Sequence, residues 1–242
     1  MGEIKMNRNF NVFSQIKKVP WWGYVGGVAS FAIQSLFYYL SNWLANITGS
    51  INWAVCTKID VIDNAIPIVP AFSIIYVYAF IFWFFAPVVV SITGKENFKK
   101  YAIGQVVAYF IGFVIYIVLP TYMNRSAEGL IDYAQKGNYW LLKIIYSVDG
   151  GNYAFNLCPS YHCLTSVYSF LAVYKKEGIS LWYKIYSFIV ALLICLATLF
   201  IKQHYFIDLV TGVLIAIIVY IVVELVFAKK NKQAQQKLYT KI

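Results

Sequence analysis

The sequence predicts an all-α membrane protein with six transmembrane helices, and two observations carry that prediction. Hydrophobic residues make up 61% of the chain and charged residues only 12%, which is far from the composition of a water-soluble domain. The apolar residues also gather in stretches of about 20, the length that a helix needs to cross a bilayer core of roughly 30 Å. No repeat, linker or low-complexity tract divides the chain, so we expect a single domain over residues 1–242.

Six apolar stretches define the predicted helices, at roughly 22–45, 71–93, 101–120, 160–175, 180–201 and 205–228. The first carries Gln34 and Asn42 and is too long for a signal peptide, so we expect it to be retained as a helix. The fourth is short, and Gly178 with its charged neighbours separates it from the fifth. Only residues 202–204 separate the fifth from the sixth, which predicts a tight hairpin.

Two segments lie outside these helices. Residues 121–158 form a long loop, whose aromatic stretch 139–146 suits an amphipathic helix at the membrane interface, where Trp and Tyr prefer to lie. Such a helix would cover a site, guide a lipid into it, or merely anchor the loop. The segment 229–242 is a basic tail.

The distribution of positive charge predicts the orientation in the membrane. Threading the chain through six helices puts 15 of its 20 Lys and Arg residues on one side, and the positive-inside rule makes that side cytoplasmic. Both termini are then cytoplasmic, and we expect the basic tail to contact anionic lipid rather than nucleic acid. The cytoplasmic set is Lys5, Arg8, Lys17, Lys18, Lys95, Lys99, Lys100, Lys175, Lys176, Lys184, Lys229, Lys230, Lys232, Lys237 and Lys241. The outer set is Lys58, Arg125, Lys136, Lys143 and Lys202.

Two short strings hold the only histidines of the chain, CPSYHCLTS at 158–166 and KQHYFIDLVTG at 202–212. They contribute His162 and His204, both at the outer ends of predicted helices. Ionisable residues at membrane depth are costly and indicate a functional site. Asp208 follows His204 by four residues, so we expect the two on one helical face, where a carboxylate orients an imidazole for nucleophilic or acid–base chemistry. The sequence therefore predicts a membrane enzyme whose site faces the outside of the cell membrane.

These strings resemble the signature of a known family, the type-2 phosphatidic acid phosphatases, and within it the branch similar to inositol phosphorylceramide synthases. The family carries three blocks: Lys-x6-Arg-Pro, Pro-Ser-Gly-His, and Ser-Arg-x5-His-x3-Asp. The second block is similar to residues 159–162 and the third to residues 197–208, whereas the first is represented only by Arg125. The resemblance extends over about residues 65–212.

The chain departs from the family pattern mainly at its cations. Val118 and Ser126 stand where the first block has Lys and Pro, and Tyr161 replaces the glycine of the second. Residues 197–198 replace Ser-Arg, so a phosphate-binding guanidinium is missing. We expect Lys202 to supply that charge, as a point charge rather than a bidentate fork.

The resemblance implies a role for each site residue. His204 attacks phosphorus, Asp208 fixes its tautomer, and His162 protonates the leaving group and then deprotonates the acceptor. The predicted phosphate-binding residues are Arg125, Lys202, Ser160 and Thr198. No metal and no cofactor are expected.

We therefore predict a metal-independent lipid phosphatase that hydrolyses a lipid phosphate monoester or pyrophosphate through a phosphohistidine. A phosphotransferase that passes a phospho-head group to a lipid hydroxyl would use the same site. A relative with a dead site would bind or transport lipid phosphates. The expected partners are the lipid substrate and the bilayer, not nucleic acid.

Overall fold

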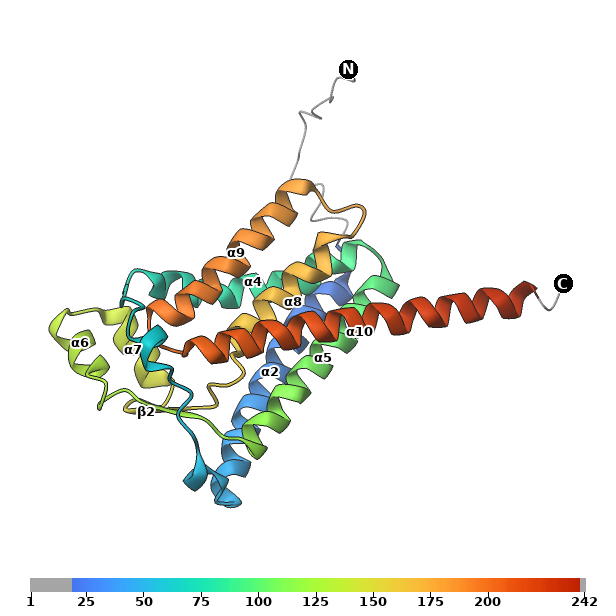
Figure 1. Ribbon diagram of the computed structural model, residues 1–242. Coiled ribbons are helices and arrows are strands. Elements are labelled where there is room, and N and C mark those ends of the chain that lie inside the picture. Colours follow the sequence, from blue (N-terminus) through green and yellow to red (C-terminus); the bar gives the residue numbers. More distant parts are fainter. Residues whose placement is uncertain (1–18, 240–242) are drawn as a thin grey trace.

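Each of the six apolar stretches folds as a helix in the computed structural model, which describes residues 19–239 (Figure 1). Helix boundaries lie within a few residues of those predicted, except at the start of the third and the end of the sixth. The helices are α2 (Trp21–Ile47), α4 (Phe72–Ile92), α5 (Lys95–Val118), α8 (Tyr161–Tyr174), α9 (Leu181–Phe200) and α10 (Phe206–Tyr239). The all-α class is thus confirmed.

Four helices in the described part of the chain are long and apolar enough to cross a membrane: α4, α5, α9 and the Phe206–Gln233 part of α10. The remaining two do not meet the same measure. α8 has only 14 residues, and α2 is interrupted by polar side chains such as Gln34 and Asn42. Six spans and the orientation of the termini therefore stay predictions.

Shorter elements build the loops between these helices. Between α2 and α4 lie the 3₁₀ turn η1 (Ser50–Trp53) and α3 (Asp60–Asp63). The loop after α5 holds strand β1 (Tyr122–Asn124), α6 (Leu130–Lys136), α7 (Trp140–Val148) and strand β2 (Tyr153–Phe155). β1 and β2 pair antiparallel, with Met123 opposite Ala154.

The predicted interfacial segment is helical as α7, and its two faces differ sharply. Leu142 and Ile145 are buried in the core, whereas Trp140, Ile144 and Val148 are exposed. These three follow one another at a spacing of four residues, so they form one apolar stripe along the helix. The exposed stripe agrees with a helix that meets lipid on one side.

The helix α8 is the centre of the packing. It lies against α4, α5, α9 and α10, while α2 packs on α4 and α5 (Figure 1). Tyr109, Tyr161, Leu164 and Tyr168 are buried in the core between them. At Gly212 of α10 an added Cβ would lie 2.5 Å from the carbonyl oxygen of Ser160, so only glycine allows this approach of the two helices.

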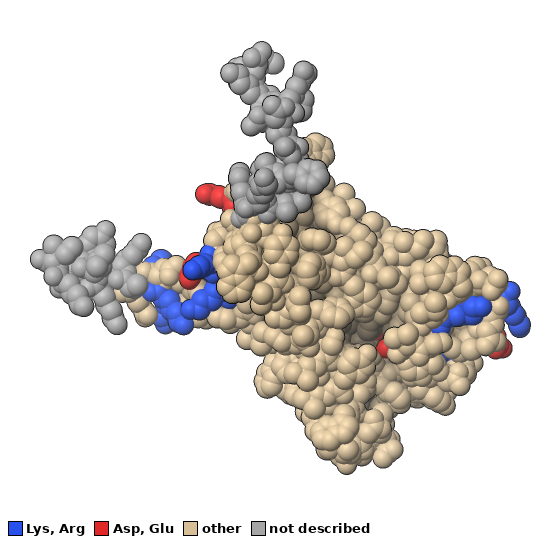
Figure 2. Space-filling model, turned by 180° about the vertical axis from the view of Figure 1, so that it is seen from behind, with Lys and Arg blue, Asp and Glu red and all other residues tan. Residues whose placement is uncertain are grey.

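Charged side chains gather at two opposite ends of the molecule in Figure 2, with a broad and nearly uncharged surface between them. One end is the C-terminal part of α10, where Lys229, Lys230 and Lys232 are exposed. This helix continues to Tyr239, beyond the predicted end near 228, because Lys, Gln and Ala all favour helices. The basic residues Lys5, Arg8, Lys17, Lys18 and Lys241 lie outside the described residues.

Gly212→Ala should destabilise the fold, because its methyl group must displace the backbone at Ser160. Overpacking of this kind costs about 1–3 kcal/mol. The measurement is the thermal unfolding midpoint in detergent, with Leu214→Ala as the control, since Leu214 lies half exposed on the outside of the same helix. Equal midpoints for Gly212→Ala and the native chain would contradict the close packing.

Candidate active site

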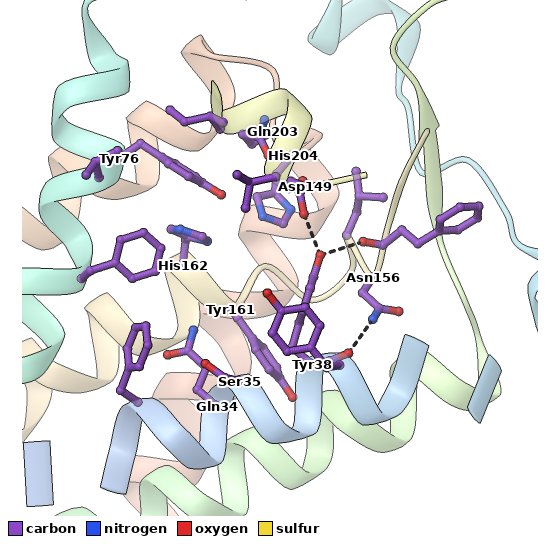
Figure 3. A pocket seen from close by; sticks show the side chains of 18 of the residues that line it. Gln34, Ser35, Tyr38, Tyr76, Asp149, Asn156, Tyr161, His162, Gln203 and His204 are labelled. Atoms are coloured by element: carbon purple, nitrogen blue, oxygen red, sulfur yellow. Dashed lines mark hydrogen bonds between the residues drawn. The ribbon is translucent and has the colours of Figure 1, made fainter. Parts of the chain in front are cut away.

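Both histidines line one cavity of about 510 Å³, which lies among α2, α4, α7, β2, the start of α8 and the α9–α10 turn (Figure 3). Their ring centroids are 6.2 Å apart. The two motifs, separated by about 40 residues of chain, thus meet at one place. One phosphate ester would be able to contact both rings at once.

The turn between α9 and α10 positions His204. The backbone N–H groups of Gln203 and His204 both donate to the carbonyl of Thr198, at 2.9 and 3.2 Å. Lys202 takes a positive φ of 51°, which lets the chain reverse directly after α9. His204 therefore precedes α10, and the predicted single helical face for His204 and Asp208 is wrong.

Asp208 nevertheless lies beside His204. Its Oδ2 is 3.7 Å from His204 Nδ1, too long for a hydrogen bond, and Nδ1 is buried with no hydrogen-bond partner in the described chain. Because Nδ1 faces the carboxylate, Nε2 is the nitrogen left for the cavity. Burial lowers the pKa of His204, but the Asp208 carboxylate raises it, and the balance lies above the usual value.

Backbone and side-chain donors fix the Asp208 carboxylate. The Thr57 hydroxyl donates to Oδ1 at 2.7 Å, and the N–H of Tyr205 donates to Oδ2 at 2.8 Å. The carbonyl of Asp208 accepts from the N–H of Ser160 at 2.9 Å. Asp208 therefore links the histidine turn, the start of α8 and the segment before α3.

His162 is the second residue of α8, and aromatic rings surround it. It stacks on Tyr76 with 4.0 Å between ring centroids, and the Trp83 ring lies at a centroid distance of 4.8 Å with an interplanar angle of 61°. Its Nε2 is buried without a hydrogen-bond partner among the residues described. Both imidazoles thus line the cavity, and each has one buried ring nitrogen without a hydrogen-bond partner among the described residues.

Ser160 and Thr198 lie directly behind the histidines, and both are fully buried. Ser160 caps α8, where its hydroxyl oxygen accepts from the N–H of Cys163 at 3.4 Å. The Thr198 hydroxyl donates to the carbonyl of Cys195 at 2.7 Å. Both hydroxyls therefore support the local backbone, and their predicted contact with phosphate stays a prediction.

A family model described as PAP2 superfamily matches residues 43–222, which is more than half of the chain. The chain belongs to the PAP2 superfamily. The match contains both histidine motifs and confirms the resemblance to type-2 phosphatidic acid phosphatases, but not the narrower branch. No curated protein and no solved structure matches the chain.

Members of the PAP2 superfamily are phosphatases or phosphotransferases, so the chain is of a type that acts on phosphate esters. Its four apolar helices agree with a membrane protein. Within residues 19–239, no group of three or more His, Cys, Asp and Glu side chains is arranged to hold a metal ion.

The guanidinium of Arg125, the remnant of the first PAP2 block, is completely buried beside the cavity. Nη1 donates to the carbonyls of Tyr146, Asp149 and Gly151 at 3.4, 2.7 and 3.1 Å. Nη2 donates to Asp149 Oδ2 at 2.6 Å and to Gln203 Oε1 at 3.1 Å. Arg125 would have to exchange its bond to Asp149 for one to a phosphate, so its phosphate-binding role stays a prediction.

Lys202 does not line the cavity that holds the two histidines. Its Nζ donates to the carbonyls of Asp63 and Ile66, both at 2.7 Å. Partial burial lowers the pKa of Lys202, although Asp63 and Glu128 oppose that shift. These contacts hold the segment before α4 onto the α9–α10 turn, and the predicted role of Lys202 at phosphate would require both to break.

Sequence reasoning missed the polar groups that share the cavity with the histidines. Asp149 accepts from the Tyr38 hydroxyl at 2.7 Å in addition to Arg125 (Figure 3). Gln203 lies in the cavity wall beside His204 and is almost fully buried. Its position next to His204 in the short turn was the only signal available, whereas nothing in the sequence pairs Asp149 with Tyr38.

Arg125→Met should destabilise the protein, because it strands the Asp149 carboxylate and three carbonyls. Breaking a buried ion pair by removing one partner costs on the order of 3–5 kcal/mol. The thermal midpoint in detergent is the measurement, and Lys136→Met, an exposed cation, is the control.

The double variant Arg125→Met/Asp149→Asn should recover part of the loss, since it removes the stranded charge. A double variant less stable than the sum of its two single changes would show that the pair is not what Arg125 stabilises.

Proposed function

We propose that the protein is a membrane lipid phosphatase that hydrolyses a lipid phosphate monoester or pyrophosphate through a phosphohistidine. The observation that carries this proposal is the pair of imidazoles that reach one cavity, with Asp208 beside His204. Two such groups supply a nucleophile and a proton donor, the two functions that phosphate ester cleavage requires. Membership in the PAP2 superfamily supports the same class of reaction.

The mouth of the cavity supports a lipid as substrate. Every cavity-lining residue that is exposed is apolar or aromatic, and they come from α2, α4 and α7. They are Phe31, Tyr39, Val77, Phe80, Ile144 and Val148. A soluble phosphate ester would gain little from such a mouth, whereas a lipid would leave its chains there, in contact with the bilayer.

The reaction is proposed in two steps. In the first, His204 Nε2 attacks phosphorus, the N–P bond forms, and the P–O bond to the lipid breaks while His162 donates a proton to the leaving oxygen. In the second, His162 takes a proton from water, the water oxygen bonds to phosphorus, and the N–P bond breaks. Asp208 stabilises the positive imidazole of His204 in the first step.

Both cations predicted to bind the phosphate are already bonded to protein groups. Arg125 lies behind Asp149 and Gln203, and Lys202 is engaged with carbonyl oxygens. We propose that Arg125 is the principal cation, because its guanidinium is bonded to the cavity-lining residues Asp149 and Gln203, whereas Lys202 Nζ is bonded to carbonyls outside the lining. Lys202, Ser160 and Thr198 then act through the turn and helix start that they stabilise.

Transfer of the phosphoryl group to an alcohol is the second candidate function. The cavity volume of about 510 Å³ supports it. That space exceeds what one phosphate needs, so an alcohol acceptor would be able to take the place of water. Incubation of the purified protein with a panel of lipid phosphates, with and without alcohol acceptors, separates the two. Free phosphate indicates hydrolysis, and a new phosphate monoester of the added alcohol, detected by mass spectrometry, indicates transfer.

We further propose that the cavity faces the outside of the cell membrane and that both termini are cytoplasmic, as the distribution of Lys and Arg indicates. Lys136→Cys and Lys232→Cys, each in a background without native cysteines, should differ in reaction with an impermeant thiol reagent on intact cells. Position 136 should be labelled and position 232 should not. The opposite pattern would reverse the orientation.

The covalent intermediate provides the sharpest test of the two histidine roles. His204→Ala should abolish both turnover and trapping of labelled phosphate as an acid-labile, base-stable adduct. His162→Ala should slow turnover of a lipid phosphate severely, yet still form adduct from nitrophenyl phosphate, whose leaving group needs no proton.

Adduct that persists in His204→Ala and disappears in His162→Ala would exchange the two roles. A native protein that binds the lipid panel without adduct or product would be a binding or transport protein instead.

A further inference from the structure

Gln34 lies in the middle of α2, and its side chain lines the cavity. A polar residue inside an apolar helix is costly at membrane depth and indicates a function. The match to the PAP2 superfamily begins at residue 43, so Gln34 lies outside the part of the chain that the family signature covers. Any contact that Gln34 makes with a substrate is therefore an addition to the shared chemistry.

A buried chain of hydrogen bonds orients this amide. Gln105 Nε2 donates to the Tyr109 hydroxyl at 2.8 Å, and the Thr165 hydroxyl donates to the same oxygen at 3.3 Å. Because the Tyr109 oxygen receives two donors, its own proton is free to be donated. It goes to Gln34 Oε1, at 3.3 Å.

The orientation of Gln34 follows from that arrangement. Its oxygen accepts from Tyr109, so Nε2 is the atom that remains, and no described residue accepts a hydrogen bond from it. In Figure 3 the Gln34 side chain extends from α2 toward the side of the cavity that holds His162. Gln105 and Tyr109 are fully buried, which makes the arrangement rigid.

The level of Gln34 along α2 decides which part of a substrate it meets. Tyr38, one helical turn away, is bonded to Asp149 in the outer loop. Gln34 is four residues further from that loop, a distance of about 6 Å along the helix axis. A phosphate placed between the histidines therefore has the lipid portion of the molecule, not the phosphate, next to Gln34.

We propose that Gln34 is a substrate-binding residue that donates a hydrogen bond from Nε2 to an ester carbonyl or hydroxyl oxygen in the lipid part of the substrate. An amide N–H is a donor only, so it matches such an oxygen. The proposal rests on the proposed function, because it places the reacting phosphate at the two histidines. Through this contact, α2 would give the site a preference for a glycerolipid or other oxygen-bearing lipid over a simple phosphate ester.

The test compares a phosphatidate with nitrophenyl phosphate, which has no lipid part. Gln34→Leu should raise KM for phosphatidate about five- to tenfold with kcat nearly unchanged, because one neutral hydrogen bond is lost. The kcat/KM for nitrophenyl phosphate should stay within about twofold of the native value, since its only contact is at the histidines.

Two further variants make the test specific. Tyr109→Phe removes the proton that orients Gln34, and it should shift KM for phosphatidate in the same direction by a smaller factor. Leu36→Ala, on the exposed side of α2, should leave the kinetic constants for both substrates unchanged. Equal losses on both substrates, or no loss on either in Gln34→Leu, would overturn the proposal.

Failure of the proposed function gives a different result. If the native protein turns over no phosphate ester, binding of a non-hydrolysable phosphonate analogue of phosphatidate replaces kinetics. Weaker binding to Gln34→Leu than to the native protein would still support the contact, and equal binding would overturn it.

Discussion

The hydrogen bond from the Ser160 N–H to the Asp208 carbonyl, at 2.9 Å, joins the first turns of two helices that lie far apart in the chain. Gly212, one turn further along α10, permits this approach because a side chain there would meet the Ser160 carbonyl. His162 is the second residue of α8, and His204 lies just before the start of α10. The separation of the two imidazoles therefore depends on how closely α8 and α10 can pack.

An apolar surrounding makes each buried polar group costly unless it has a partner. The protein meets this constraint with local sets of hydrogen bonds. Asp208 is held by Thr57 and a backbone N–H, and Gln34 is held by Tyr109. Several buried polar atoms of the described residues lack a partner, and the ring nitrogens His162 Nε2 and His204 Nδ1 are among them, together with the neighbouring amide nitrogen Gln203 Nε2. An unpaired nitrogen on His162 agrees with the proton transfer proposed for that residue.

The chain lacks cations of the family pattern, and the arginine that remains near the cavity is already paired with protein groups. Arg125, the one guanidinium that the described residues place near the cavity, is neutralised by Asp149 and also bonded to Gln203. An arginine with a carboxylate partner in the resting site is less attractive to phosphate than a free one. Binding of the proposed substrate would then depend more on its lipid part, which fits a cavity whose exposed rim is apolar or aromatic.

The sequence by itself determined the helices, since apolar stretches of bilayer length leave few alternatives. It also made His162, His204 and Asp208 the candidate site residues through their cost at membrane depth. Only the tertiary structure decided what surrounds them. Asp149 and Gln34 share the cavity with the histidines through packing between distant segments, which no local spacing reveals. The same holds for Lys202, whose charge suggested a phosphate ligand until the fold turned it toward two backbone carbonyls. Periodicity and composition show which polar residues are costly to bury in a membrane helix. The hydrogen-bond partner that offsets this free-energy cost depends on how the helices cross, which only the tertiary structure shows.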